Sequence, residues 1–88
     1  MYRVRLARRA ERGLRRIHQG DPRGYDRVKV ALVALAEHPR PEGATKLTGF
    51  DPPAWRLRVG DYRIVYEIRD EELIVIVVNV APRGEVYK

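Results

Sequence analysis

The sequence predicts an α+β domain with the element order β-α-α-β-β-β, in which two N-terminal helices pack on one face of a mainly antiparallel sheet. Three observations lead to this fold class: helical periodicity between residues 7 and 36, a hairpin pattern around Gly60-Asp61, and an apolar run at 73–80. Because 88 residues leave little room for a second core, we expect a single domain over residues 1–88.

The first elements are a short strand and a helix. Residues 2–6 alternate apolar and polar, which predicts a strand with Tyr2, Val4 and Leu6 directed inward. Apolar residues then recur at helical spacing, and Gly20 is placed to end this helix. The apolar stripe is Ala7, Ala10, Leu14 and Ile17, and the outer side carries Arg8, Arg9, Arg12, Arg15 and Arg16.

A second helix is predicted from Asp21 to about Glu37. Asp21 is suited to the N-cap, and Pro22 to the first helical position. The buried stripe of this helix is Tyr25, Val28, Leu32, Leu35 and Ala36. Prolines at 39 and 41 stop the helix, and we expect an irregular loop through Gly49 that carries Lys46.

Residues 55–66 read W-R-L-R-V-G-D-Y-R-I-V-Y, two alternating runs joined by a Gly-X turn, which predicts a β-hairpin. A two-residue loop at 60–61 places Arg58 opposite Arg63. One face is then apolar and is expected to lie under the helices: Trp55, Leu57, Val59, Tyr62, Ile64 and Tyr66.

The other hairpin face carries Arg56, Arg58 and Arg63, with Glu67 as the one nearby acid. Like charges opposite each other destabilise a strand pair, and planar guanidinium groups suit phosphate. The hairpin alone leaves two interpretations equally open, an anion site and an ordinary solvated face.

The last strand leads back to this arginine face. An acidic turn at 70–72 precedes the apolar run 73–80, which is typical of a central strand covered on both sides. Antiparallel order brings the end of this strand beside Arg63, so that Arg56, Arg58, Arg83 and Tyr87 converge there. Cations stabilise the charge of a pentacoordinate phosphorane, and nearby guanidinium groups favour a tyrosine phenolate. The alternative for Tyr87 is an aromatic residue that closes the core edge.

The composition of the chain limits the partners and the catalytic groups that can be expected. The net charge is +6, and fifteen of the eighteen basic residues are Arg. The pI of about 10.2 favours nucleic acid, an anionic membrane surface or an acidic protein as partner. The chain has neither Cys nor Ser, and His18 and His38 lie on different elements, so neither a Ser/Cys nucleophile nor a metal site is expected. No apolar run has the length of a membrane span, which fits a cytoplasmic location without membrane contact.

The chain resembles the RelE branch of the RelE/ParE superfamily of type II toxins. The resemblance rests on A-E-H-P-R-P (36–41), K-L-T-G (46–49), the hairpin (54–68), L-I-V-I-V-V-N-V (73–80) and R-G-E-V-Y (83–87). It implies a metal-independent, cofactor-free endoribonuclease that enters the ribosomal A site and cuts mRNA by attack of the 2′-hydroxyl on the adjacent phosphate. It also implies a cognate antitoxin as partner.

The resemblance assigns expected roles to individual residues. Arg56 and Arg58 match backbone-binding positions, and Lys46 is a further candidate for phosphate binding. Arg63 matches an arginine that stabilises the transition state, Arg83 a residue that stabilises charge or helps protonate the leaving oxygen, and Tyr87 a proposed general base.

Ala81-Pro82 departs from the family pattern, because many relatives carry Gly-His or Gly-Lys there. This departure is the best argument for a catalytically weak RNA-binding domain as an alternative to the nuclease. A second alternative is a ParE-like toxin that poisons DNA gyrase, since that branch shares the fold but does not depend on the arginine and tyrosine residues. The arginine row of the first helix fits a solvated face, a ribosomal RNA contact or an acidic antitoxin contact.

Overall fold

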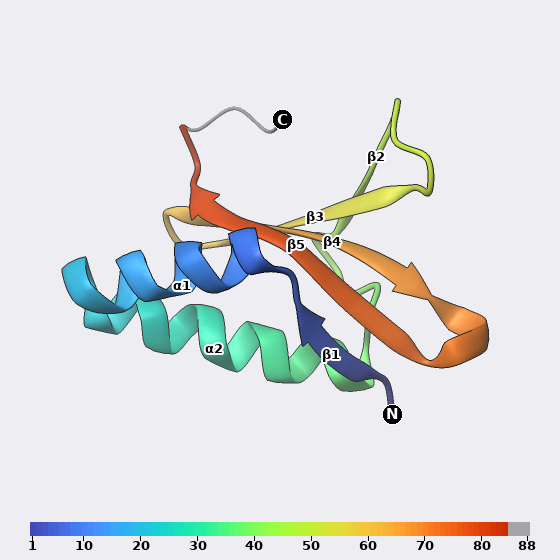
Figure 1. Cartoon of the computed structure of the whole chain (residues 1–88), viewed down its shortest axis with the longest axis horizontal. Helices are drawn as coiled ribbons and strands as arrows, with labels where there is room; N and C mark the ends of the chain where they lie inside the picture. Colours follow the sequence, from blue (N-terminus) through green and yellow to red (C-terminus); the bar gives the residue numbers. More distant parts are fainter. Residues whose placement is uncertain (85–88) are drawn as a thin grey trace.

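The computed structural model describes residues 1–84 (Figure 1). The chain forms β1 (Arg3–Leu6), α1 (Arg8–Gly20), α2 (Pro22–Glu37), β2 (Thr45–Leu47), β3 (Ala54–Val59), β4 (Tyr62–Arg69), the 3-10 turn η1 (Asp70–Glu72) and β5 (Ile74–Pro82). The sheet has the order β1-β5-β4-β3-β2, and every pairing is antiparallel except the parallel pair β1–β5. Both helices lie on one face of the sheet, so the predicted α+β class is confirmed (Figure 1).

The helix boundaries follow the predicted capping residues. The Gly24 N–H donates to Asp21 Oδ1 at 3.1 Å, which satisfies one of the free donors at the start of α2, and Pro22 occupies the first helical position. Gly20 is the last residue of α1. The two helices therefore meet at a corner fixed by Asp21.

The core lies between the two helices and the three middle strands. The predicted apolar face of the hairpin belongs to it: Ile64 and Tyr66 are fully buried, and Trp55, Leu57, Val59 and Tyr62 pack against the buried cluster. The helices contribute Ala10, Ile17, Val28, Leu32 and Leu35, and β5 contributes Val75, Val77 and Val80. This burial holds the hairpin flat against the helices and turns its other face outward.

The hairpin has the predicted register. Val59 pairs with Tyr62, Arg58 with Arg63, and Leu57 with Ile64. Gly60 has φ +58°, and a glycine with positive φ at the first central position is the requirement of a type II′ turn.

A β-bulge in β5 was not predicted. Val65 pairs with Asn79 and Tyr66 with Val77, so Val78 is an extra residue on its strand. Because β5 is apolar throughout, its sequence has no alternation that reveals this step. The bulge sets the register that brings Ala81 opposite Arg63.

Three expectations are wrong in detail. Residues 45–47 form strand β2 rather than part of an irregular loop, since they pair with β3. The helices cover only one face of β5, and Ile74 and Ile76 are half-buried, so this strand is central without a layer on both sides. Leu6 is 37% exposed rather than inward, because β1 is an edge strand.

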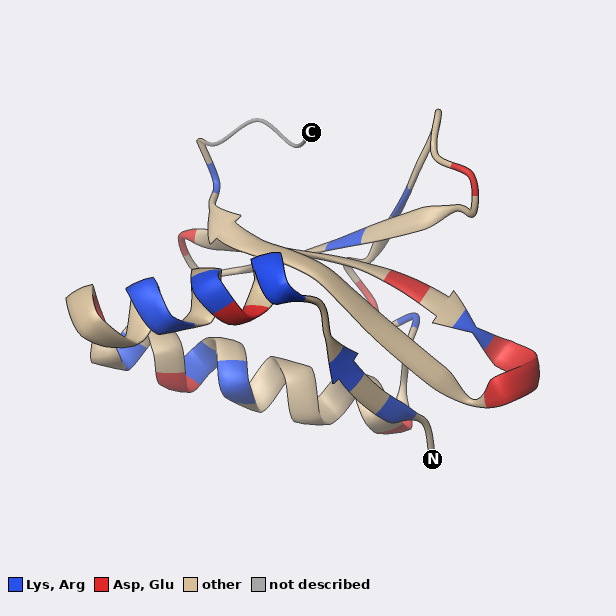
Figure 2. Ribbon diagram, in the orientation of Figure 1, with Lys and Arg blue, Asp and Glu red and all other residues tan. Residues whose placement is uncertain are grey.

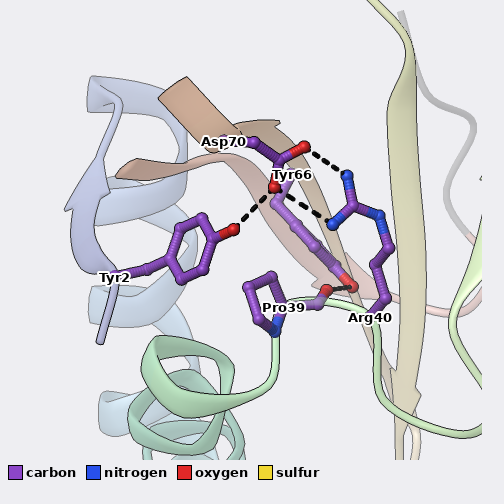
Figure 3. A network of polar contacts seen from close by, with 5 residues as sticks. All are labelled: Tyr2, Pro39, Arg40, Tyr66 and Asp70. Atoms are coloured by element: carbon purple, nitrogen blue, oxygen red, sulfur yellow. Dashed lines mark hydrogen bonds and ion pairs between the residues drawn. The ribbon is translucent and has the colours of Figure 1, made fainter. Parts of the chain in front are cut away.

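A polar network fixes the segment between α2 and β2 to the sheet (Figure 3). Arg40 donates to both carboxylate oxygens of Asp70 at 3.1 and 2.7 Å, and the Tyr2 hydroxyl donates to Oδ1 at 2.6 Å. The Tyr66 hydroxyl donates to the Pro39 carbonyl oxygen at 2.7 Å. The Arg40 guanidinium also lies over the Trp55 ring, 5.4 Å from its centroid. This network anchors the chain just before the edge strand β2.

Candidate functional site

The arginine face is built on two neighbouring cross-strand rows. In the first row, Arg58, Arg63 and Ala81 lie side by side on β3, β4 and β5. In the second, Arg56 is opposite Val65. Directly opposed Cβ atoms are about 5 Å apart, so the charges of Arg58 and Arg63 start from adjacent positions on one surface.

Arg83 joins this group at the end of β5. Its backbone N–H donates to the Asp61 carbonyl oxygen at 2.9 Å, which ties the strand end to the hairpin turn. Arg63 and Arg83 line one open pocket of about 430 Å³ together with Asp61, Pro82 and Gly84. We call this the arginine pocket. Arg63 is half-buried and its Nε atom is shielded from solvent, whereas Arg83 is exposed.

Lys46, another predicted site residue, does not join the arginines. Lys46 pairs with Trp55, so the alternation of the strands places it on the helix side of the sheet, away from Arg56. Tyr87 lies outside the described residues. Its convergence with the arginines therefore stays a prediction.

Asn79 is a neighbouring polar residue that was not singled out from the sequence. It is opposite Val65, one row from Arg63, and is only 9% exposed. The available signal was a lone polar residue in an otherwise apolar run, because buried polar side chains need a specific reason to be retained.

Acidic residues gather most densely at the η1 end of the sheet (Figure 2). The acidic residues of η1 lie at the end where Arg69 pairs with Ile74, and the arginine pocket lies at the opposite end of β4 and β5. Glu67, the nearest predicted acid on the arginine face, forms an ion pair with Arg69 at 3.2 Å. At the site end the arginine pocket holds Arg63 and Arg83 against Asp61, a net positive charge that is suited to an anion.

The two tyrosines of the hairpin are neutral hydrogen-bond donors. The hydrogen bond that the Tyr62 hydroxyl donates to Asp21 Oδ2, at 2.8 Å, raises the pKa of Tyr62. Burial raises the pKa of Tyr66 to about 12. Neither group is suited to accept a proton near neutral pH.

Within residues 1–84, no three His, Asp or Glu side chains lie together in a way that holds a metal ion. Over the same range, neither helix is long and apolar enough to cross a membrane.

Known proteins share this sequence and this fold. The profile of the family described as "ParE toxin of type II toxin-antitoxin system, parDE" matches residues 4–87. The mRNA interferase toxin RelE of Escherichia coli is 42% identical over 65 residues, covering 70% of this chain and 67% of that protein.

Solved structures agree over almost the whole chain. RelE in the archaeal RelE–RelB complex of Pyrococcus horikoshii matches with a TM-score of 0.79 and 25% identity, covering 97% of this chain and 98% of that one. A chain of the intact E. coli RelBE toxin–antitoxin complex matches with a TM-score of 0.77 and 29% identity, covering 97% and 100%.

The fold is thus that of toxins from type II toxin–antitoxin systems. The chain belongs to the RelE/ParE superfamily of toxins from type II toxin–antitoxin systems.

Proposed function

We propose that this toxin inhibits translation by cutting mRNA in the ribosomal A site, without a metal ion or cofactor. The observation that carries the proposal is the arginine pocket, where Arg63 and Arg83 line one open depression and Arg58 lies directly opposite Arg63 on the neighbouring strand. Fixed cations aimed at a phosphate stabilise the charge that develops in phosphoryl transfer. The similarity to a RelE named as an mRNA interferase supports the same chemistry.

The reaction is an internal transesterification. A base removes the proton of the 2′-hydroxyl, the 2′-oxygen bonds to the adjacent phosphorus, and the bond to the 5′-oxygen breaks as that oxygen takes a proton. The products are a 2′,3′-cyclic phosphate and a 5′-hydroxyl. We assign the base to Tyr87, stabilisation of the phosphorane to Arg63, and charge stabilisation or proton supply at the leaving oxygen to Arg83.

Binding of the RNA backbone is assigned to the hairpin. Arg56 and Arg58 project from β3 beside the arginine pocket and hold phosphates next to the scissile one. The placement of Lys46 on the helix side of the sheet favours a more peripheral phosphate contact for this residue.

The partners follow from the family. RelE relatives have been solved as complexes with RelB, and we propose a cognate antitoxin for this chain as well. The other partners are the ribosome and its mRNA, in the cytoplasm.

A ParE-like toxin that poisons DNA gyrase is the second candidate, favoured by the ParE description of the matching family profile. That function does not need the arginine pocket or Tyr87. A catalytically weak RNA-binding domain is the third, because Ala81-Pro82 replaces the usual Gly-His or Gly-Lys beside Arg63 and Arg83.

Mapping of RNA 5′ ends in a cell-free translation extract separates these functions. Purified wild-type protein should produce cuts within codons of translated mRNA, and Tyr87→Phe should not. Intact mRNA together with inhibition of gyrase-driven supercoiling would support the ParE-like function. Intact mRNA with unaffected gyrase would support the weak RNA-binding domain.

A further inference from the structure

A second basic surface lies where α1 crosses the end of β5, on the helix side of the sheet. We call it the α1 groove. It has a volume of about 500 Å³, and its lining includes Arg9, Arg12, Arg16, Tyr62, Val80 and Pro82. The helix lies directly on the strand because Gly13 has no side chain: a Cβ there would overlap the Val80 carbonyl oxygen. The arginine stems therefore start close to the strand end.

The arginines of α1 fall into two sets. Residues 9, 12 and 16 follow the helical spacing of one face and line the groove. Arg8 and Arg15 do not line the groove, and Arg15 borders a different depression with Glu11 and His18. The groove is thus not a consequence of a uniformly basic helix, and the second set provides a matched control.

The groove has a surplus of positive charge. Within residues 1–84, Arg12 and Arg16 form no ion pair. Asp21, which also borders the groove, already accepts hydrogen bonds from the Tyr62 hydroxyl and the Gly24 N–H. Arg12 and Arg16 are four residues apart on the helix, a spacing at which like charges repel, and a bound anion relieves that repulsion.

Pro82 connects the groove with the proposed reaction site. It lines both the α1 groove and the arginine pocket, one on each side of the end of β5. A chain of phosphates that leaves the arginine pocket over Pro82 therefore meets Arg12 and Arg16 next. Along the helix axis, Arg9 and Arg16 are about 10 Å apart, enough for about two or three successive phosphates.

We propose that the α1 groove binds the phosphates that flank the scissile one on the same RNA strand. This inference rests on the proposed function for the identity of the strand. Charge complementarity and continuity through Pro82 favour a single-stranded RNA backbone as the occupant. Guanidinium groups hold phosphates regardless of base, so the groove adds affinity without sequence preference.

The test compares two double variants with the same change in charge. Arg12→Glu/Arg16→Glu alters the groove, and Arg8→Glu/Arg15→Glu alters two arginines of the same helix that do not line it. Fluorescence anisotropy measures binding of 2′-O-methyl RNA, which cannot be cleaved, as a decamer and as a trimer. We expect the groove variant to bind the decamer at least about tenfold more weakly. The slope of the logarithm of the binding constant against the logarithm of the salt concentration should be less steep by about 1.4, because two phosphate contacts are lost. Trimer binding should change less than about twofold in the same variant.

The control variant should bind the decamer within about threefold of wild type. Arg12→Gln/Arg16→Gln removes the two positive charges without adding negative ones, so its loss of decamer affinity should be smaller but in the same direction. This variant keeps the test valid if the Glu variant fails to fold. Equal losses in the two Glu variants, or no decamer binding by wild type at about 50 mM salt, would overturn the proposal. Unchanged decamer binding with weaker cosedimentation on ribosomes would assign the groove to ribosomal RNA instead. Because 2′-O-methyl RNA reports binding alone, a loss of the groove effect is distinguishable from a failure of the cleavage chemistry.

Discussion

Arg58 and Arg63 face each other directly across the β3–β4 hairpin, in the row that ends at Ala81. A sheet that places two guanidinium groups opposite each other loses stability unless an anion lies between or above them. This relationship links the fold to the proposed reaction, because two guanidinium groups that start from adjacent positions on one sheet face would stabilise the charge of a phosphorane.

Replacing Arg58 should separate stability from activity. Arg58→Ala removes the opposed charge, so we expect the free energy of unfolding to stay equal or to rise by up to about 0.5 kcal/mol. Cleavage of ribosome-bound mRNA should fall, because a phosphate contact is lost. Urea denaturation and single-turnover cleavage measure the two effects. A clear loss of stability in Arg58→Ala would show that the side chain has a structural role.

The close contact of α1 with β5 predicts opposite effects at two glycines. Gly13→Ala should destabilise the protein by about 1–3 kcal/mol, since the added Cβ meets the Val80 carbonyl and forces the helix away. Gly20→Ala should be neutral or stabilising by up to about 1 kcal/mol, because nothing lies within 4 Å of an added Cβ and alanine is the better helix former. Urea midpoints of the two variants test this; a neutral Gly13→Ala would contradict the described packing.

The Arg40–Asp70 contact predicts acid sensitivity. Hydrogen bonds from Arg40 and then Tyr2 lower the pKa of Asp70 from 3.8 to about 2. The contact therefore contributes stability above the ordinary pKa, and this contribution is lost as the pH falls through about 2. We expect Asp70→Asn to have a lower Tm than wild type at neutral pH, and the difference to shrink as the pH falls from about 4 to 2. Thermal unfolding between these pH values measures it; a constant difference would contradict the assignment.

The Tyr62–Asp21 hydrogen bond predicts a link between the helix corner and the site. Tyr62→Phe keeps the ring but removes the 2.8 Å hydrogen bond, so the hairpin tip beside Arg63 should open more often. Amide hydrogen exchange at residues 61–63 should accelerate in this variant. Tyr25→Phe is the control, because within residues 1–84 the Tyr25 hydroxyl forms no hydrogen bond. If amide hydrogen exchange at residues 61–63 were equally fast in both variants, the Tyr62 hydroxyl would not hold the hairpin tip closed.

The hairpin could be predicted to the residue from sequence. Alternation with a period of two and a Gly-Asp turn determine both the register and the face of every side chain, so Arg58 and Arg63 could be paired in advance. Asp21-Pro22 similarly identified the start of α2, because capping is a local interaction.

The features that the sequence did not predict, strand β2 and the bulge in β5, depend on contacts between segments that are far apart in the chain. Thr45–Leu47 is too short to show a strand pattern, and it becomes β2 only by pairing with β3. Its register, which a sequence of three residues does not reveal, places Lys46 on the side away from Arg56. The bulge at Val78 lies in a run without alternation, so the exact partner of Arg63 on β5 followed only from the structure.

The assignment of the reaction to the arginine pocket is tested by single-turnover cleavage of mRNA on purified ribosomes. The rates of Arg63→Ala and Arg69→Ala are compared with that of wild type. Both arginines lie on β4, but Arg63 lines the arginine pocket, whereas Arg69 pairs with Glu67 at the other end of the strand. We expect the rate to fall at least about a hundredfold for Arg63→Ala, as for removal of one group that stabilises a transition-state charge, and less than about twofold for Arg69→Ala. Equal rates for Arg63→Ala and wild type would contradict the assignment of the reaction to this pocket.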